Sequence, residues 1–123
     1  MKKWRGGFMQ KKSKIEKKFV SLQKFMYLIS HIPQIKELCE QHKVDKLYAF
    51  GSVLTDRFTK DSDVDLLVDI KDKDPISYSE LYFDLKFKLE DLFNRPVDLL
   101  EERAIKNPYF RQYLDETKQL IYG

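Results

Sequence analysis

FGSVLTDRFTKDSDVDLLV, residues 50–68, is the stretch that decides the fold of this sequence. It starts where the apolar and aromatic run 46–50 meets a Gly-Ser pair, and it ends in acids that alternate with apolar residues. Short apolar runs that stop at glycine are typical of buried strands. We therefore predict one strand over 46–50 and a second over 62–70, with a turn at Gly51-Ser52 after the first.

Two acids, Asp63 and Asp65, lie two positions apart on the second predicted strand. Because side chains alternate along a strand, both carboxylates point to one face and the apolar residues between and after them point to the core. Carboxylates about 6–7 Å apart repel each other unless a cation lies between them. Oxygen ligands of this kind suit Mg²⁺ or Mn²⁺. The alternative is a pair of solvated acids at a strand end.

A third acid, Asp98, stands in the stretch RPVDLL, residues 95–100. Its neighbours are apolar and predict a third strand over 97–100, and an acid in so apolar a strand needs a partner. If this strand lies beside the second one, three carboxylates meet at one point. We predict that Asp63, Asp65 and Asp98 together form a divalent-metal site.

The Gly51-Ser52 turn has the features of a phosphate-binding turn. Glycine allows the backbone to approach a phosphate closely, free N–H groups at a helix start favour an anion, and the Ser52 hydroxyl is a further donor. Arg57 and Lys60 follow before the acids and could meet phosphate charge. The alternative is an ordinary strand-to-helix turn with Ser52 as its N-cap.

The remaining chain predicts helices around a small sheet. Apolar spacing predicts a helix over 77–93, and Asn107-Pro108 opens a last helix with Phe110, Leu114 and Ile121 inward. Apolar residues recur at helical spacing from Ile15 to Ile29, before a short helix that ends the N-terminal part. The order of elements predicts an α/β (α+β) fold with a small mixed sheet.

Length and composition narrow the class of protein. The chain has 123 residues, of which 42% are hydrophobic, and this suits one folded domain. A single cysteine excludes an intrachain disulfide and a Cys-based zinc site. No apolar run approaches the roughly eighteen residues of a membrane span, so we expect no membrane association and a cytoplasmic location.

Charge divides the chain into two parts. Residues 1–24 carry nine Lys or Arg and one Glu, a net charge of +8. Residues 25–123 carry fourteen Lys or Arg and nineteen Asp or Glu, a net charge of −5. We interpret 1–13 as a basic flexible arm and 14–123 as a single domain. A nucleic-acid-binding role for the basic end is the weakest interpretation, because no known binding module is present.

Together these features resemble the minimal nucleotidyltransferases of the DNA polymerase β superfamily. The resemblance rests on the Gly-Ser turn, a spacer of ten residues, the Asp-x-Asp strand and a lone acid on a later strand. It implies the nucleotidyltransferase fold and transfer of a nucleoside monophosphate, chiefly AMP from ATP, to a macromolecular hydroxyl with release of pyrophosphate. It also implies that Asp63, Asp65 and Asp98 hold two Mg²⁺ ions, and that Gly51 and Ser52 cradle the triphosphate.

The resemblance has one departure and one consequence for partners. Many minimal members carry a basic residue directly after the Gly-Ser pair, where this chain has Val53 and Leu54, so Arg57 or Lys60 must substitute. Minimal members are commonly paired with a HEPN-domain toxin, and this implies an antitoxin. The alternative is a non-catalytic module that masks a partner protein, and a homo-oligomer stays open.

Overall fold

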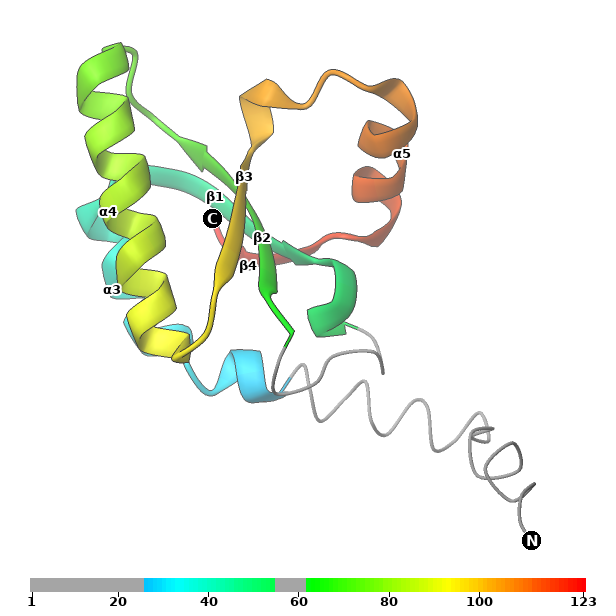
Figure 1. Cartoon of the computed structure of the whole chain (residues 1–123), viewed down its shortest axis with the longest axis horizontal. Coiled ribbons are helices and arrows are strands. Elements are labelled where there is room, and N and C mark those ends of the chain that lie inside the picture. Colours follow the sequence, from blue (N-terminus) through cyan, green and yellow to red (C-terminus); the bar gives the residue numbers. More distant parts are fainter. Residues whose placement is uncertain (1–25, 55–61) are drawn as a thin grey trace, which may run out of the picture.

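The computed structural model describes residues 26–54 and 62–123. Its centre is a four-stranded sheet with the strand order β3-β2-β1-β4 (Figure 1). The strands are β1 (Val44–Phe50), β2 (Val64–Ile70), β3 (Val97–Glu101) and β4 (Gln119–Tyr122). β2 runs antiparallel to β1 and parallel to β3, and β4 runs antiparallel to β1. The predicted small mixed sheet is therefore confirmed.

Helices cover both faces of this sheet. α3 (Ile32–Gln41) and α4 (Pro75–Phe93) lie on one face, and α5 (Pro108–Thr117) lies on the other (Figure 1). Two short 3₁₀ turns, η1 (Gly51–Leu54) and η2 (Glu102–Ala104), follow β1 and β3. No helix in the described ranges is long and apolar enough to cross a membrane.

The main core lies between the sheet and the α3–α4 layer. Alternate residues of the strands enter it, including Leu47, Leu66 and Leu99, and each is no more than 2% exposed. Leu85 and Leu89 of α4 pack against these strand residues from the helix layer, and both are fully buried. The predicted alternation of side chains along β2 is thus confirmed. Val64, Leu66 and Val68 fill the main core, whereas Asp65 lies on the opposite face of the sheet.

Local sequence signals explain where α4 and α5 begin. Asp74 and Asn107 each precede a proline and accept backbone hydrogen bonds as N-caps, from Ser77 N and from Tyr109 N and Phe110 N. Proline at the first helical position loses no helical hydrogen bond. α4 begins at Pro75, two residues before the predicted start, and it ends at Asn94 in the left-handed conformation.

The C-terminus differs from the prediction. The last helix ends at Thr117, and Ile121 belongs to β4 rather than to the helix. β4 adds an edge strand beside β1, which would otherwise leave its backbone groups unpaired. The prediction of one continuous helix was wrong because four residues are too few for a period to separate strand from helix.

The N-terminal predictions lie mostly outside the described residues. The arm 1–13 and the helical set from Ile15 to Leu22 belong to that part of the chain. Residues 26–29 are helical, but Leu28 is the buried residue there, whereas Met26 and Ile29 are exposed. The helix face that the spacing predicts through Met26 and Ile29 is therefore not the buried side of this segment.

Candidate active site

The Gly51 turn and Asp65 are in direct contact. Phe50 pairs with Asp65 across β1 and β2, so the chain turns at Gly51 immediately beside this carboxylate. Gly51 has φ +71, and a Cβ built on it would lie 2.4 Å from Asp65 Oδ2. Only glycine has neither the steric cost of this backbone conformation nor the clash. Turn and carboxylate therefore belong to one site.

Two of the three predicted acids lie side by side. Asp65 and Asp98 are register partners on the parallel strands β2 and β3, so they share a face of the sheet. Asp63 precedes β2, which begins at Val64 rather than at the predicted residue 62. Asp63 and Asp98 are exposed and Asp65 is partly exposed, so the described carboxylates face solvent.

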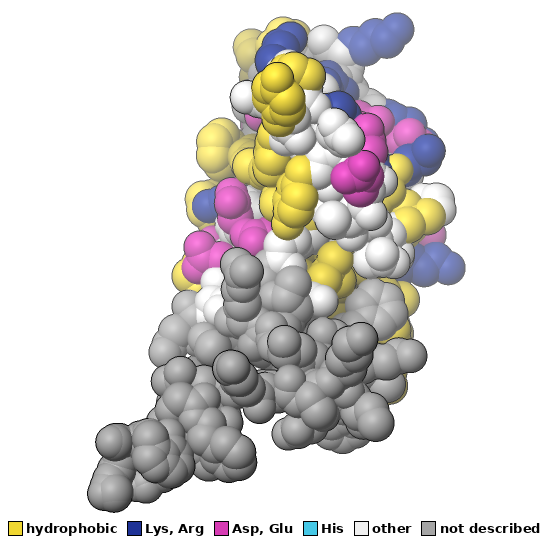
Figure 2. All heavy atoms as spheres, turned by 90° about the vertical axis from the view of Figure 1, so that its right-hand side faces the viewer, with side chains coloured by type: hydrophobic (Ala, Val, Ile, Leu, Met, Phe, Trp, Pro, Cys, Tyr) yellow, Lys and Arg dark blue, Asp and Glu magenta, His cyan; other side chains and the backbone are white. Residues whose placement is uncertain are grey.

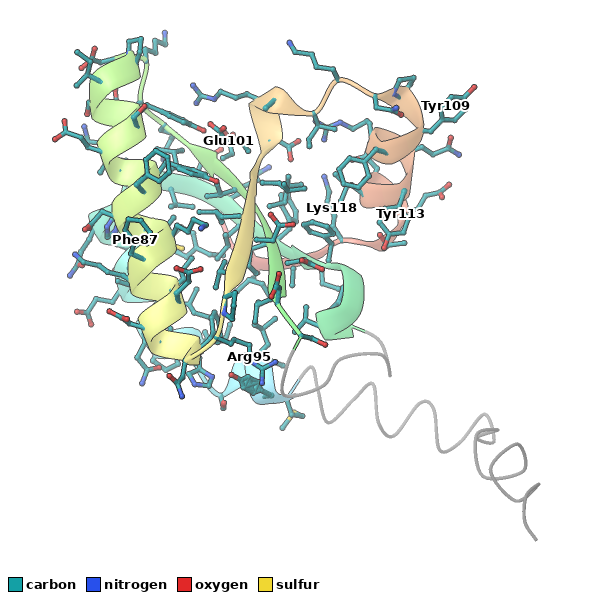
Figure 3. The ribbon with its side chains drawn as sticks, viewed as in Figure 1. Phe87, Arg95, Glu101, Tyr109, Tyr113 and Lys118 are labelled. Atoms are coloured by element: carbon teal, nitrogen blue, oxygen red, sulfur yellow. The ribbon has the colours of Figure 1, made fainter. Side chains whose placement is uncertain are left out.

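The loop between α4 and β3 fixes the backbone around Asp63. Arg95 Nη1 donates to the carbonyl oxygen of Ser62 at 3.1 Å, and Val64 N donates to the carbonyl oxygen of Pro96 at 3.0 Å. These two hydrogen bonds hold the residues on either side of Asp63. Figure 3 shows Arg95 where α4 meets β3, and its guanidinium also lies over the Tyr27 ring at 5.3 Å.

Arg95 is the residue that sequence analysis missed. The sequence feature that could have indicated a role for Arg95 is its position next to Pro96, just before the strand that carries Asp98. A basic residue there has many uses, and only the folded arrangement shows that it reaches back to the residue before Asp63. The same loop thus connects the backbone of Asp63 to the strand of Asp98.

One residue of α4, Tyr82, reaches the free edge of β3. Tyr82 Oη donates to the carbonyl oxygen of Leu99, which satisfies an edge acceptor. Burial raises the pKa of Tyr82, and the negative charges of Glu101 and Asp98 raise it further. The phenol therefore stays a neutral donor at physiological pH, and it holds the strand of Asp98 against the helix layer.

A second apolar cluster lies on the same face of the sheet as the acids. Phe50, Leu67 and Leu114 are its buried members, and α5 covers them. Phe110 contacts the Phe50 ring edge-on at 6.3 Å and stacks on Tyr113 at 6.1 Å. Phe50 is therefore a core residue, as expected for a buried strand over 46–50. The aromatic series leads from the Gly51 turn to the surface of α5, and Figure 3 shows Tyr113 at that surface.

The surface over α5 is mixed in character. Figure 2 views this side of the molecule and shows hydrophobic side chains grouped together, with acidic side chains on either side. Lys118 Nζ lies over the Tyr48 ring at 4.4 Å, beside the second apolar cluster. A macromolecule that approaches the carboxylates from this side would meet both kinds of side chain.

The described carboxylates are the type of ligand that binds a divalent cation, but they do not form a complete set of protein ligands. All donors are carboxylate oxygens, two of them on neighbouring strands, and Mg²⁺ takes few carboxylates and completes its shell with water and phosphate. Within 26–54 and 62–123, no group of three or more His, Cys, Asp or Glu is placed to hold a metal by itself.

Two predicted phosphate-binding residues, Arg57 and Lys60, lie outside the described residues. Of the Gly-Ser turn itself, the backbone forms η1. Val53 is fully buried and Leu54 packs against the core. The two positions after Ser52 thus serve packing, and the phosphate contacts of a basic residue must come from elsewhere.

Relatives of known sequence align with most of the chain. The family model "Polymerase beta, Nucleotidyltransferase" matches residues 33–123. MJ0126 and MJ1379 of Methanocaldococcus jannaschii, which are named as protein adenylyltransferases, are 37% and 33% identical over 102 residues. Each alignment covers 79% of this chain and 99% of the relative.

Solved structures give the same fold. A minimal nucleotidyltransferase superimposes with a TM-score of 0.64 at 28% identity, covering 76% of this chain and 92% of that one. A toxin-antitoxin complex with AMP-PNP matches with a TM-score of 0.59 at 24% identity, covering 75% and 73%. The family model matches more than half of the chain, and the M. jannaschii relatives are more than 30% identical, so the chain is a member of the polymerase β-type nucleotidyltransferase family.

Proposed function

We propose that this protein transfers AMP from ATP to a hydroxyl group of a protein, with Asp63, Asp65 and Asp98 as its catalytic carboxylates. The observation that carries the proposal is the contact of the Gly51 turn with Asp65, which is itself paired with Asp98. A turn that can approach phosphates then lies directly beside acids that can hold cations. The named activity of the M. jannaschii relatives supports AMP transfer to protein.

Each residue has a separate task in the proposed reaction. Asp63 and Asp65 would hold Mg²⁺ against the triphosphate, and Asp98 would complete the site nearest the acceptor; Mn²⁺ has the same ligand preference. Bound divalent ions stabilise the charge of the attacking and leaving oxygens. The backbone of Gly51 and Ser52 would contact the β- and γ-phosphates, with Arg57 and Lys60 as further phosphate ligands.

The chemical step is an in-line displacement. The acceptor hydroxyl oxygen forms a bond to the α-phosphorus of ATP, and the bond from that phosphorus to the oxygen bridging to the β-phosphate breaks. Pyrophosphate leaves with the electron pair of that bond. The hydroxyl proton passes to the Asp98 carboxylate, which is exposed, and from there to water.

Arg95 is a positioning residue in this proposal. Its hydrogen bond to the Ser62 carbonyl oxygen fixes the backbone immediately before Asp63. Asp63 lies outside the regular strand, so the β ladder does not hold it as it holds Asp65. Without Arg95, the first carboxylate would sample more positions, and a site needs its groups placed within a fraction of an ångström.

A structural neighbour supports our proposal for the acceptor class. One solved neighbour contains a tri-AMPylated HEPN toxin of Shewanella oneidensis in complex with an MNT antitoxin. We propose the same role here, an antitoxin that adenylylates a HEPN-domain toxin. We also propose that the protein acts in the cytoplasm, where ATP and such a partner are available.

A second function is favoured by one observation. Val53 is fully buried and Leu54 is partly buried against the core, at the positions where the family resemblance implies a basic residue. If Arg57 and Lys60 do not replace it, triphosphate binding is weak, and the protein acts by masking its partner without transfer.

The test uses ATP labelled at the α-phosphate or at the γ-phosphate, with Mg²⁺ and a lysate of the source organism. Transfer of the α-label alone to a protein, absent in Asp65→Asn, is the expected result. Transfer of the γ-label would mean phosphoryl transfer and would contradict the proposal. Tight binding of an unlabelled protein by both wild type and Asp65→Asn would support the masking function instead.

A further inference from the structure

α4 is apolar on two opposite sides. Its inner side, with Leu85 and Leu89, fills the main core. Its outer side carries Ile76, Phe83 and Phe87, which are 73%, 51% and 57% exposed. Their spacing of seven and four residues places them on one stripe of the helix. A helix that only covers a sheet needs one apolar side, so the outer stripe requires another explanation.

Two rings of the stripe are stacked, and the stripe lies beside a groove. The rings of Phe83 and Phe87 are stacked with centroids 6.3 Å apart. A groove of about 560 Å³ runs between this stripe and the C-terminal end of α3, lined in part by Gln41, Leu81 and Phe83. Figure 3 shows Phe87 on α4, on the other side of the sheet from Tyr109 and Tyr113 of α5. The stripe is therefore separate from the candidate active site.

The charges that flank the stripe are mixed in sign and favour a self-complementary contact. Glu80 and Asp84 precede Lys88 along one flank, and Lys88 Nζ lies 2.9 Å from Asp84 Oδ2 within the helix. On the other flank, Lys86 lies 3.7 Å from Glu90. A partner with charge of one sign would meet both attraction and repulsion on this surface. When a second α4 packs in the opposite direction, the acids of one helix lie opposite the lysine of the other.

We propose that the outer stripe of α4 is the contact between two copies of this chain, related by a two-fold axis with their α4 helices antiparallel. The register that places Phe83 opposite Phe87 of the second copy forms a cluster of four phenylalanines. In that register Lys88 falls opposite position 82, between Glu80 and Asp84 of the second copy. Each of these acids is two residues, or about 3 Å, from that point.

The arrangement leaves both active sites open. The acids and the Gly51 turn lie on the face of the sheet that α5 covers, whereas the contact uses the opposite layer. Two copies joined through α4 would present two catalytic faces away from each other. A symmetric acceptor could then be modified by two sites of one assembly.

The test measures the mass of the protein in solution across a wide range of concentrations by sedimentation equilibrium. Wild type is expected to form a concentration-dependent dimer. Phe87→Glu buries a charge in the contact and should weaken dimerisation about thirtyfold or more. Tyr109→Glu is the matched control, since Tyr109 is an 82% exposed aromatic residue of α5, and it should leave the dimer unchanged.

Charge reversal tests the register independently of the apolar stripe. Glu80→Lys or Lys88→Glu alone should weaken the dimer, and the double variant should restore part of the lost affinity, because Asp84 stays acidic. Circular dichroism and melting curves confirm that each variant is folded. A wild type that stays monomeric at all concentrations overturns the proposal. So does a dimer that Phe87→Glu leaves intact, and a failure of the double variant to recover overturns the antiparallel register.

Discussion

The two faces of the sheet differ in how completely they are closed. On the α3–α4 face, strand residues such as Leu47, Val68 and Val97 are no more than 3% exposed. On the α5 face, Asp98 is exposed and Asp65 is partly exposed, although Phe50 and Leu67 beside them are buried. Burial of apolar surface is thus concentrated on one face, and the other can present carboxylates. Substitutions on the two faces should therefore separate stability from activity.

The largest effect is expected for Asp65→Asn. The amide keeps the shape of the side chain but lacks the charge that binds a cation, so transfer should fall at least about a thousandfold. The melting temperature should not fall, because Asp65 and Asp98 are direct neighbours and like charges in that position repel. Paired measurements of label transfer with Mg²⁺ and of melting without metal check both parts. Unchanged transfer would reject the proposed site.

Leu85→Ala should act in the opposite manner. Leu85 is fully buried in the main core, and its truncation should lower the free energy of unfolding by about 2–5 kcal/mol. Leu114→Ala is the matched variant on the α5 face, where the buried cluster is smaller, and its loss should lie at the lower end of that range. Urea unfolding gives both values. A larger loss for Leu114 than for Leu85 would contradict the assignment of the main core.

Gly51→Val should reduce both nucleotide affinity and stability. The φ of +71 disfavours any side chain, and a Cβ would press on Asp65 Oδ2. Backbone strain of this kind costs about 1–3 kcal/mol, which a folded domain can tolerate. Calorimetric titration with ATP and Mg²⁺ should show clearly weaker binding, whereas circular dichroism should show a folded protein. Equal ATP affinity in both proteins would remove the turn from the mechanism.

The two faces of the sheet also differ in how much of them the sequence predicts. The alternation in β2 was sufficient to assign Val64, Leu66 and Val68 to the core and Asp65 to the other face, because strand periodicity is a local property. The sheet order is not local. Nothing in the residues themselves shows that β1 lies beside β2, which is what brings Gly51 onto Asp65.

The missed features share a physical reason. β4 is a strand because its backbone pairs with the edge of β1. Arg95 affects the site because its side chain donates to the carbonyl oxygen of the residue before Asp63. Both are consequences of tertiary packing, whereas the local pattern around them is too short to decide. The start of α4 is different: Asp74-Pro75 is a strong N-terminal signal, and it was present in the sequence.

Arg95 provides a finer test of the open face. Arg95→Gln removes the charged donor that reaches the Ser62 carbonyl oxygen, so Asp63 should be less well fixed and transfer should fall about tenfold. Half-saturation should need more Mg²⁺, a change that a purely structural loss would not produce. Arg95→Lys keeps a donor and should recover part of the activity. An unchanged Mg²⁺ requirement in Arg95→Gln would contradict the positioning role.

The smallest effect is expected at the rim of the closed face, where Asp84 joins α4 to α3. Asp84 accepts a hydrogen bond from Lys88 at 2.9 Å and contacts Nε2 of the buried His42 at 2.6 Å. Lys88 first, and then His42, lower the pKa of Asp84 below its ordinary value of 3.8. A lowered folded-state pKa stabilises the fold above the unfolded-state pKa, and the contribution is lost as pH falls through the folded value. Asp84→Asn should therefore lower the urea midpoint slightly at neutral pH, and the difference from wild type should disappear in acid. Asp91→Asn, at another exposed acid of α4, is the control, and a difference for Asp84→Asn that persists or grows below pH 3.8 would show that its charge is not the cause.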